Sequence, residues 1–337
     1  MSARRAKGFS LIEFMVSVVL GLVLISGLVV IYLGAKRSYT ETEQVAQLSE
    51  HGRFAVQMLT EALRHVGFFG AAHPRDIALD GNLGAVAGDC AGLAGAYEVG
   101  SYLLAATAAS GSPVFGCVPD ARTGTEVLLI KHVLPDPRYD ADPDNASAAR
   151  DGVISFPTGL DAQDVYVIAN SERGVLLDGA DTAPDVREGA DVPLGVAWPY
   201  RVQMFYIRDN GGELSLSRRV LGWNAGAGQM ELTTEELVPG AEDLRFRFGV
   251  DANAPFNGEV DTWMTTAGAV AAGVWARVEA VEISLLLRSL AEDPGYEDNK
   301  SYELGGVTVT PGGNWRRLLV QNKVSMRNPK LMIRGGL

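Results

Sequence analysis

Residues 8–35, GFSLIEFMVSVVLGLVLISGLVVIYLGA, decide the architecture of this chain. The run from Phe14 to Ala35 contains no charged residue, and a helix of those 22 residues would be roughly 33 Å long at ~1.5 Å per residue. That length is enough to cross a bilayer. Three basic residues lie within the first seven, so the positive-inside bias predicts a cytoplasmic N-terminus and an outward-facing remainder.

One carboxylate, Glu13, lies at the start of this apolar run. A charged group near an apolar helix is costly and is therefore a functional hypothesis by default. A plain membrane anchor has no need of it. A cleaved secretory signal has a shorter apolar core of about 7–15 residues, and Leu33-Gly34-Ala35 fits its cleavage site poorly.

The order of features resembles the class III signal of type IV prepilins: a short basic leader, then Gly8, Phe9-Ser10-Leu11-Ile12-Glu13, and an uncharged run. The resemblance implies that a prepilin peptidase cuts after Gly8 and methylates Phe9 as the new N-terminus. Glu13 would be the family's acidic fifth residue, which serves in docking and assembly. Residues 1–8 would be a cleaved cytoplasmic leader, and 9–35 a transmembrane and assembly helix.

The helix is expected to continue beyond the membrane as an amphipathic spine over residues 36–70. Apolar and small residues recur at three- and four-residue steps, with polar residues between them. They are Val45, Leu48, Gly52, Ala55, Leu59, Ala62 and Val66. The region of Gly67 and Gly70 is a plausible end for the helix.

The remainder is expected to be a β-rich head. Residues 71–197 are loop-rich, with short apolar runs at 127–133, 165–169 and 175–177, and they carry no family resemblance. Residues 198–330 contain stronger strand patterns, which include a hairpin turn at 209–212 and strict alternation at 244–250 and 281–288. Since no long crossover helix intervenes, we expect one antiparallel sheet with a face on the spine, which is an α+β, pilin-like fold.

Further stretches resemble the PilW family of minor type IV pilins. They are residues 61–70, 238–244, 281–289 and 316–328. This resemblance implies a structural subunit that helps prime pilus assembly, joins the pilus tip complex, and serves twitching motility, adhesion or DNA uptake. The implied partners are other minor pilins, the major pilin, the pilus assembly platform, the prepilin peptidase and a PilY-type tip adhesin. The implied location is the inner membrane, with the head in the periplasm, and later the pilus tip at the cell surface.

Two alternatives remain open at this point. A J-type minor pseudopilin of a type II secretion system would have the same fold, although such pseudopilins are usually shorter. The second is a membrane-anchored extracytoplasmic module that binds its ligand in a calcium-dependent way. An enzyme is not expected, because the chain lacks a Gly-x-Ser-x-Gly nucleophile motif and a phosphate-binding loop.

Charge argues against nucleic acid as a partner of this subunit. The formal net charge is −12, and removing the leader's Arg4, Arg5 and Lys7 lowers it to −15. Nucleic acid requires a basic face, and an anionic lipid surface would repel an acidic body.

The two cysteines, Cys90 and Cys117, lack the paired spacing of a zinc site. Because an outward-facing head lies where disulfides form, we expect them to form one; the alternative is two separate thiols. Family members often place a cysteine just after residue 70, where this chain has Ala71 and Ala72, so the pairing cannot be copied from the family.

No resident cofactor is expected, apart from a possible calcium loop. The alternating acids Asp140, Asp142 and Asp144 are followed by Asp151 in the twelfth place, but the glycine at position six and the terminal glutamate are missing. Asp251, Asn253, Asn257 and Asp261 form a second, looser set.

Overall fold

The computed structural model describes residues 8, 10–138, 160–186, 189 and 191–335. The chain divides into two compact units, residues 1–47 and residues 48–337. The described part of the first unit is almost entirely helix. The second unit, the head, contains the end of the same helix together with all of the strands.

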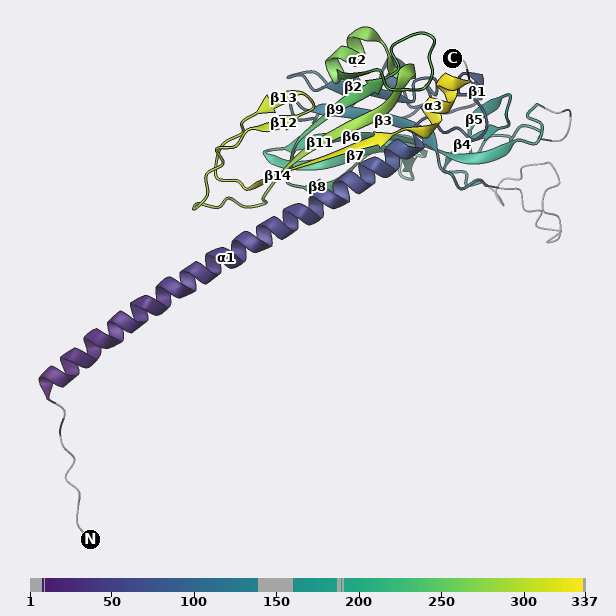
Figure 1. Cartoon of the computed structure of the whole chain (residues 1–337). Coiled ribbons are helices and arrows are strands. Elements are labelled where there is room, and N and C mark those ends of the chain that lie inside the picture. The colour runs from purple at the N-terminus through teal and green to yellow at the C-terminus, as the bar shows by residue number, and fades with distance from the viewer. Residues whose placement is uncertain (1–7, 9, 139–159, 187–188, 190, 336–337) are drawn as a thin grey trace. The chain divides into compact units, whose positions relative to one another are not determined.

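Helix α1 runs from Leu11 to His65 and is drawn in purple (Figure 1). It contains one segment long and apolar enough to cross a membrane, and none of that segment is buried within the structure. The buried residues of α1 begin at Leu48 and recur along one side to Leu63. This one-sided burial confirms the predicted spine. Gly67 follows with φ +71°, a backbone conformation that ends the helix and that glycine adopts most easily.

Within the described residues, the larger sheet has eight strands. They are β1 (Ile77–Leu79), β2 (Leu103–Thr107), β3 (Glu126–Val133), β4 (Val165–Ala169), β5 (Gly174–Asp178), β6 (Val196–Asn210), β7 (Glu213–Asn224) and β8 (Gln229–Pro239). The main order is β1-β5-β4-β6-β3-β2, and β7 joins β6 to β8. Every pair is antiparallel except β1 with β5. The hairpin predicted at residues 209–212 connects β6 to β7.

The second sheet has four strands in the order β10-β9-β11-β14. Their bounds are β9 (Ala241–Val250), β10 (Thr262–Thr265), β11 (Val278–Arg288) and β14 (Arg317–Ser325). A separate hairpin pairs β12 (Tyr302–Leu304) with β13 (Val307–Val309). Short helices complete the head: α2 (Thr266–Ala272), α3 (Arg327–Arg334), and the 3-10 turns Pro74–Asp76, Gly92–Ala94 and Trp275–Arg277.

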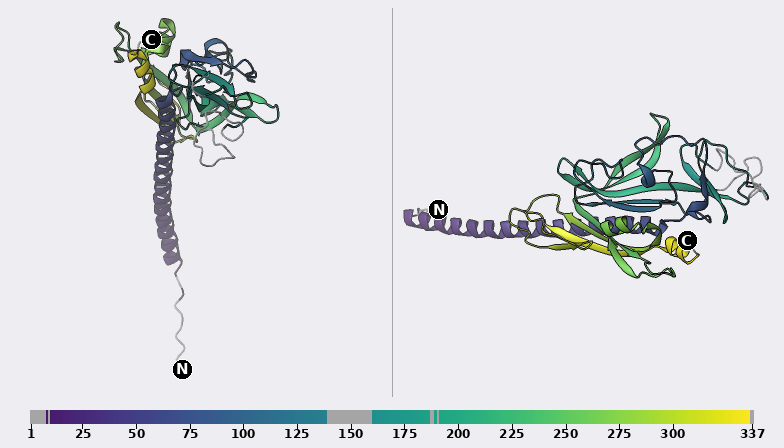
Figure 2. Two further views of the ribbon diagram at one scale, coloured as in Figure 1. Left: turned by 90° about the vertical axis from the view of Figure 1, so that its right-hand side faces the viewer. Right: turned by 90° about the horizontal axis from the view of Figure 1, so that it is seen from above.

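The α+β, pilin-like architecture with a predominantly antiparallel head is confirmed, but the head has two packed layers of sheet instead of one. β9 packs against β3, β6 and β7 of the larger sheet, and the right-hand view of Figure 2 separates the two layers. The chain passes from one layer to the other at Gly240, whose φ of +76° turns β8 into β9, and a Cβ there would lie 2.6 Å from the Arg288 carbonyl oxygen. Two layers bury an inner face of each sheet, which one layer on a single helix could not do.

The expected division of the head at residue 197/198 has a specific place in the structure. That boundary falls inside β6, the strand that pairs with β4 and β3 as well as with β7. The expected alternation is nevertheless confirmed, since Leu244, Phe246, Phe248 and Val250 are fully buried. Residues 71–197 therefore supply five strands of the sheet that residues 198–239 complete.

We predict that Gly52→Leu destabilises the head. A Cβ at Gly52 would lie 2.7 Å from Val320 Cγ2 and 3.1 Å from Leu287 Cδ1, where α1 crosses the four-stranded sheet. Overpacking of this kind costs about 1–3 kcal/mol, and over most of that range the cost exceeds the roughly 1 kcal/mol of helix propensity gained by replacing glycine. Thermal unfolding of the detergent-solubilised protein should show a lower midpoint.

Glu50→Leu is the matched control, because Glu50 is exposed on the same helix. An unchanged midpoint for Gly52→Leu, with Glu50→Leu also unchanged, would contradict the close packing of α1 on β14.

Candidate processing and assembly site

The N-terminus of α1 is closed by a reciprocal pair of hydrogen bonds. The Ser10 backbone N–H donates to Glu13 Oε2 (2.9 Å), and the Glu13 backbone N–H donates to Ser10 Oγ (3.2 Å). Ser10 is thus the N-cap and Glu13 the third helical residue, the arrangement called a capping box. The carboxylate also lies at the positive end of the helix dipole. Glu13 therefore has a local structural role that the sequence analysis did not identify.

Gly8 is exposed, and a Cβ built on it would meet no atom within 4 Å. Phe9 and the basic residues of the leader lie outside the described residues. The structure thus brings Ser10 and Glu13 together at the helix start, directly after the expected cleavage position. From Leu11 to Leu20 every residue is exposed, so this end of α1 is accessible in the isolated chain.

The predicted disulfide is confirmed. Cys90 and Cys117 are bonded, with their Cα atoms 4.8 Å apart, and both residues are buried. Their sulfur atoms lie 3.7 and 3.9 Å from Met204 Sδ on β6. The bridge therefore closes a 27-residue separation against the larger sheet, which stabilises the fold by about 3–4 kcal/mol in the simple chain-entropy account.

A buried lysine holds the loop that follows Cys90. Lys131 on β3 is fully buried, and its Nζ donates to the carbonyl oxygens of Leu93 (3.1 Å), Gly95 (2.7 Å) and Glu98 (2.7 Å). Three acceptors match the three N–H donors of an ammonium group. Burial lowers the pKa of Lys131 to about 7, while the negative charges of Glu98 and Asp89 act against that shift. The lysine thus fixes a segment with little secondary structure.

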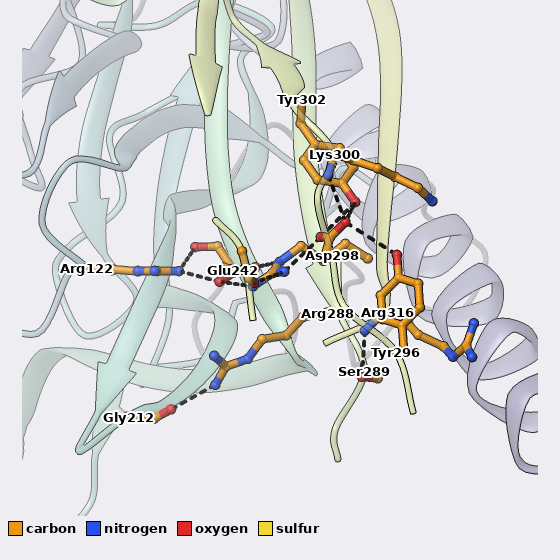
Figure 3. A network of polar contacts seen from close by, with 12 residues as sticks. Arg122, Gly212, Glu242, Arg288, Ser289, Tyr296, Asp298, Lys300, Tyr302 and Arg316 are labelled. Carbon is orange, nitrogen blue, oxygen red and sulfur yellow. Dashed lines mark hydrogen bonds and ion pairs between the residues drawn. The ribbon is translucent and has the colours of Figure 1, made fainter. Parts of the chain in front are cut away.

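A second buried network is centred on Arg317 of β14. Its Nε donates to Glu242 Oε2 of β9 (2.5 Å), and its Nη1 donates to Asp298 Oδ2 (2.8 Å). The three side chains are 3%, 6% and 0% exposed, so both ion pairs are removed from water. Tyr302 donates its hydroxyl to the same Asp298 oxygen (3.0 Å), as Figure 3 shows.

This network joins parts of the head that are distant in sequence. Arg122, just before β3, donates to the Glu242 backbone carbonyl and lies 3.8 Å from its carboxylate, which links the larger sheet to β9 (Figure 3). Burial alone would raise the pKa of the Asp298 carboxyl, but the hydrogen bonds from Arg317 and Tyr302 hold it below its usual value. The position of β14 therefore depends on a guanidinium shared by two buried carboxylates.

The first proposed calcium loop remains a prediction, because Asp140, Asp142, Asp144 and Asp151 lie outside the described residues. In the second, looser set of candidate calcium ligands, the two carboxylates close a loop by accepting backbone hydrogen bonds. Asp251 Oδ2 accepts the N–H groups of Asn257 and Gly258, and Asp261 Oδ2 accepts those of Ala252 and Asn253. Within the described parts of the chain, no group of three or more His, Cys, Asp or Glu side chains could hold a metal ion.

Sequence reasoning missed three of these features. The Ser10-x-x-Glu13 pattern before an apolar run is a known signature of a capped helix and could have identified the first. Lys131 and Arg317 occur in strand patterns where a charged residue is normally taken to be exposed. Their partners come from loops and strands many residues away, so no local signal could have identified them.

Comparison with known families gives two matches. Residues 3–29 match the model of the prokaryotic N-terminal methylation motif. Residues 204–328 match the model of PilW, the type IV pilus-assembly protein W. That second match runs from the middle of β6 to the start of α3 and so covers the whole of the four-stranded sheet. No curated protein and no solved structure matches the chain.

A methylation motif at the start of a membrane-length helix, followed by an α+β head, defines a prepilin that is anchored in the inner membrane and assembled into a pilus. The two matches support a PilW-family minor type IV pilin. Members of this class function in pilus assembly as structural subunits that interact with other pilus components.

We predict that Arg317→Met destabilises the head by about 3–5 kcal/mol, because it leaves Glu242 and Asp298 buried without their cation. Denaturant unfolding of the detergent-solubilised protein measures the effect. The pKa of Asp298 is lowered in the folded state, so its contribution to stability is present above its ordinary pKa and is lost as the pH falls through the folded value. The wild-type protein should therefore lose more stability in acid than Arg317→Met.

Lys323→Met is the matched control on the same strand. Lys323 Nζ lies 3.2 Å from Glu282 Oε2, but its side chain is 64% exposed, so the loss should be below about 1 kcal/mol. Equal losses for the two variants would contradict the importance of the buried network.

Proposed function

We propose that this minor pilin helps to prime pilus polymerisation and remains in the pilus tip complex. The observation that carries the proposal is a single carboxylate, Glu13, at the capped start of a helix that is otherwise uncharged to Ala35. A lone polar group on such a helix can set the position of one subunit against another when both lie near lipid. The PilW match supports a pilus rather than a secretion pseudopilus.

The proposed series of assembly steps begins in the inner membrane. The prepilin peptidase cuts after Gly8, and this cleavage creates a charged amine on Phe9 just before the start of α1. The peptidase then methylates that amine. Glu13 lies one helical turn further on, so in a lone subunit it can partly neutralise its own terminus. In the assembled complex, Glu13 meets the amine of a neighbouring subunit instead, and low surrounding dielectric strengthens that pairing.

The proposed partners are other minor pilins, the major pilin, the assembly platform and a PilY-type tip adhesin. The proposed consequences are twitching motility, adhesion or DNA uptake. The role is structural, and no reaction is assigned to the chain itself. Deleting the gene and restoring it on a plasmid, with a count of surface pili in each strain, tests this role as a whole.

We predict that Gly8→Val leaves the leader attached and prevents assembly. A side chain here would obstruct the approach of the peptidase to the following bond. Since a Cβ at Gly8 meets nothing within 4 Å, the substitution should not disturb the chain itself. Mass spectrometry of the N-terminus should find the leader retained in the variant and a methylated Phe9 in the native protein.

Gly34→Val is the control, because a Cβ at Gly34 also meets no atom within 4 Å and lies far along α1 from the cleavage position. It should be processed normally. A native protein whose mature N-terminus is Met1, or lies beyond Ala35, would overturn the proposal.

We predict that Glu13→Gln weakens recruitment by at least about tenfold, which corresponds to about 1.4 kcal/mol, while processing and membrane insertion stay intact. Glutamine can still accept the Ser10 N–H and keep the cap, but it removes the charge that would meet a neighbour's amine. Co-purification of the processed, full-length variant with its pilin partners measures the effect, together with a count of surface pili.

Two variants separate capping from docking. Ser10→Ala removes the bond that the Glu13 N–H makes to Ser10 Oγ but keeps the carboxylate, so partner recovery should fall much less. Glu13→Leu removes both functions and should be at least as impaired as Glu13→Gln. Undiminished recovery and normal piliation with Glu13→Gln would show that the charge is not the docking group.

A further inference from the structure

A groove of about 730 Å³ lies in the head between the end of α1 and strand β14. Its helical wall includes Arg53, Val56, Thr60 and Arg64, and β14 contributes Leu318, Val320 and Asn322. Asn322 Nδ2 donates to Thr60 Oγ1 (2.9 Å), which ties the strand to the helix. The groove therefore has a partly apolar lining beneath a polar helix face.

The outer edge of β14 is open along this groove. Ser289 N–H donates to Arg316 O (2.8 Å) and Met326 N–H to Glu279 O (2.7 Å), and both bonds continue the β11–β14 register. Even-numbered residues of β14 therefore direct their backbone groups toward β11, and odd-numbered residues direct theirs away. β14 is the last strand of its sheet, and no described residue forms a backbone–backbone bond to its outer edge. The residues whose backbone groups face outward include Leu319, Gln321 and Lys323.

The lysine that could discourage pairing at this edge is directed elsewhere. An exposed lysine on an edge strand normally discourages another strand from pairing there. The Lys323 ammonium instead lies 3.2 Å from Glu282 on β11 and 4.9 Å from the centre of the Trp263 ring on β10. Both partners lie inward from β14 in the sheet order, so the charge is directed across the sheet and away from the free edge.

The charge of the groove differs from that of the whole chain. Arg53 and Arg64 are exposed on the groove's helical wall, and neither forms an ion pair with any described acid. Glu61 is the single acid that lines the groove. The chain as a whole has a net charge of −12, so a cationic groove favours an acidic occupant.

We propose that this groove binds an extended, acidic segment of another pilus subunit, which adds as a strand to β14. Unpaired backbone N–H and C=O groups give such a segment its register, and Val320 and Leu318 receive its apolar side chains. A helix satisfies its backbone groups internally and would leave the edge unpaired. A lipid tail offers no backbone groups either. The inference rests on the proposed role in assembly and identifies the surface through which one partner is held.

Photo-crosslinking in cells that assemble pili tests the proposal. A photoreactive amino acid at Gln57, an exposed groove residue, should form an adduct with an extended segment of a different pilus subunit. Gln321→Pro removes the central outward N–H and places a ring on the edge, where proline is tolerated. The adduct should fall about tenfold, because the added strand loses a hydrogen bond and meets the ring. An adduct with a second copy of this chain, or with a helix, would overturn the proposal.

Gln321→Ala is the matched control for the proline variant. Gln321 Nε2 donates to Ser284 Oγ and to the Glu303 carbonyl oxygen, and both substitutions remove these bonds while alanine keeps the backbone N–H. Alanine should retain the adduct.

If thermal unfolding shows that Gln321→Pro does not fold, the double variant Arg53→Glu, Arg64→Glu carries the test. Arg173→Glu, at an exposed arginine outside the groove, is its control. The double variant should lose the adduct about tenfold and Arg173→Glu should not.

The failure of this inference can be distinguished from failure of the proposed function. If Gly8→Val abolishes pili while folded Gln321→Pro and the double arginine variant keep full adduct and normal pili, the groove is not the docking surface and the assembly role stands. If Gly8→Val leaves pili normal, the assembly role itself is wrong, and the inference is overturned with it.

Discussion

One helix in this protein has to suit two different surroundings. The first part of α1 is exposed on all sides and uncharged from Phe14 to Ala35, which suits lipid or other helices. From Leu48 onward the same helix buries one side against strands. The head must therefore leave the polar side of that helix uncovered. The groove beside β14 lies along this uncovered side, so it is a consequence of a spine that is only half enclosed.

An open edge strand is normally a liability, and β14 needs independent support to stay in place. Among the described strands only β11 pairs with it, so half of its backbone groups gain nothing from the sheet. Arg317 supplies the missing constraint at one end of β14 and Asn322 supplies another toward the middle. Burying an ion pair is a poor way to gain stability, since desolvation offsets most of the attraction, but it specifies one geometry. This role suits a strand whose position matters for a partner.

The sequence predicted the features that depend on local pattern. Charge-free length predicted the membrane segment, three- and four-residue spacing predicted the spine, and strict alternation predicted the burial of Leu244, Phe246, Phe248 and Val250. The arrangement in two layers was not predictable in this way, because it depends on a turn at Gly240 and on which strand β6 pairs with along its length. The ionic network was missed for the same reason: Arg122, Glu242, Asp298 and Arg317 are brought together by the fold and not by spacing.

The two uses of Glu13 compete for one carboxylate, and their energies indicate how an exchange could work. Its cap on Ser10 is worth about 1 kcal/mol, as for other helix N-caps. A neighbour's amine in a medium of low dielectric offers a stronger interaction, so docking can displace the cap at modest cost. The cap in turn keeps the carboxylate directed along the helix start before a neighbour arrives. A carboxylate that its own chain binds weakly and its partner binds strongly can dock with little loss of stabilising free energy.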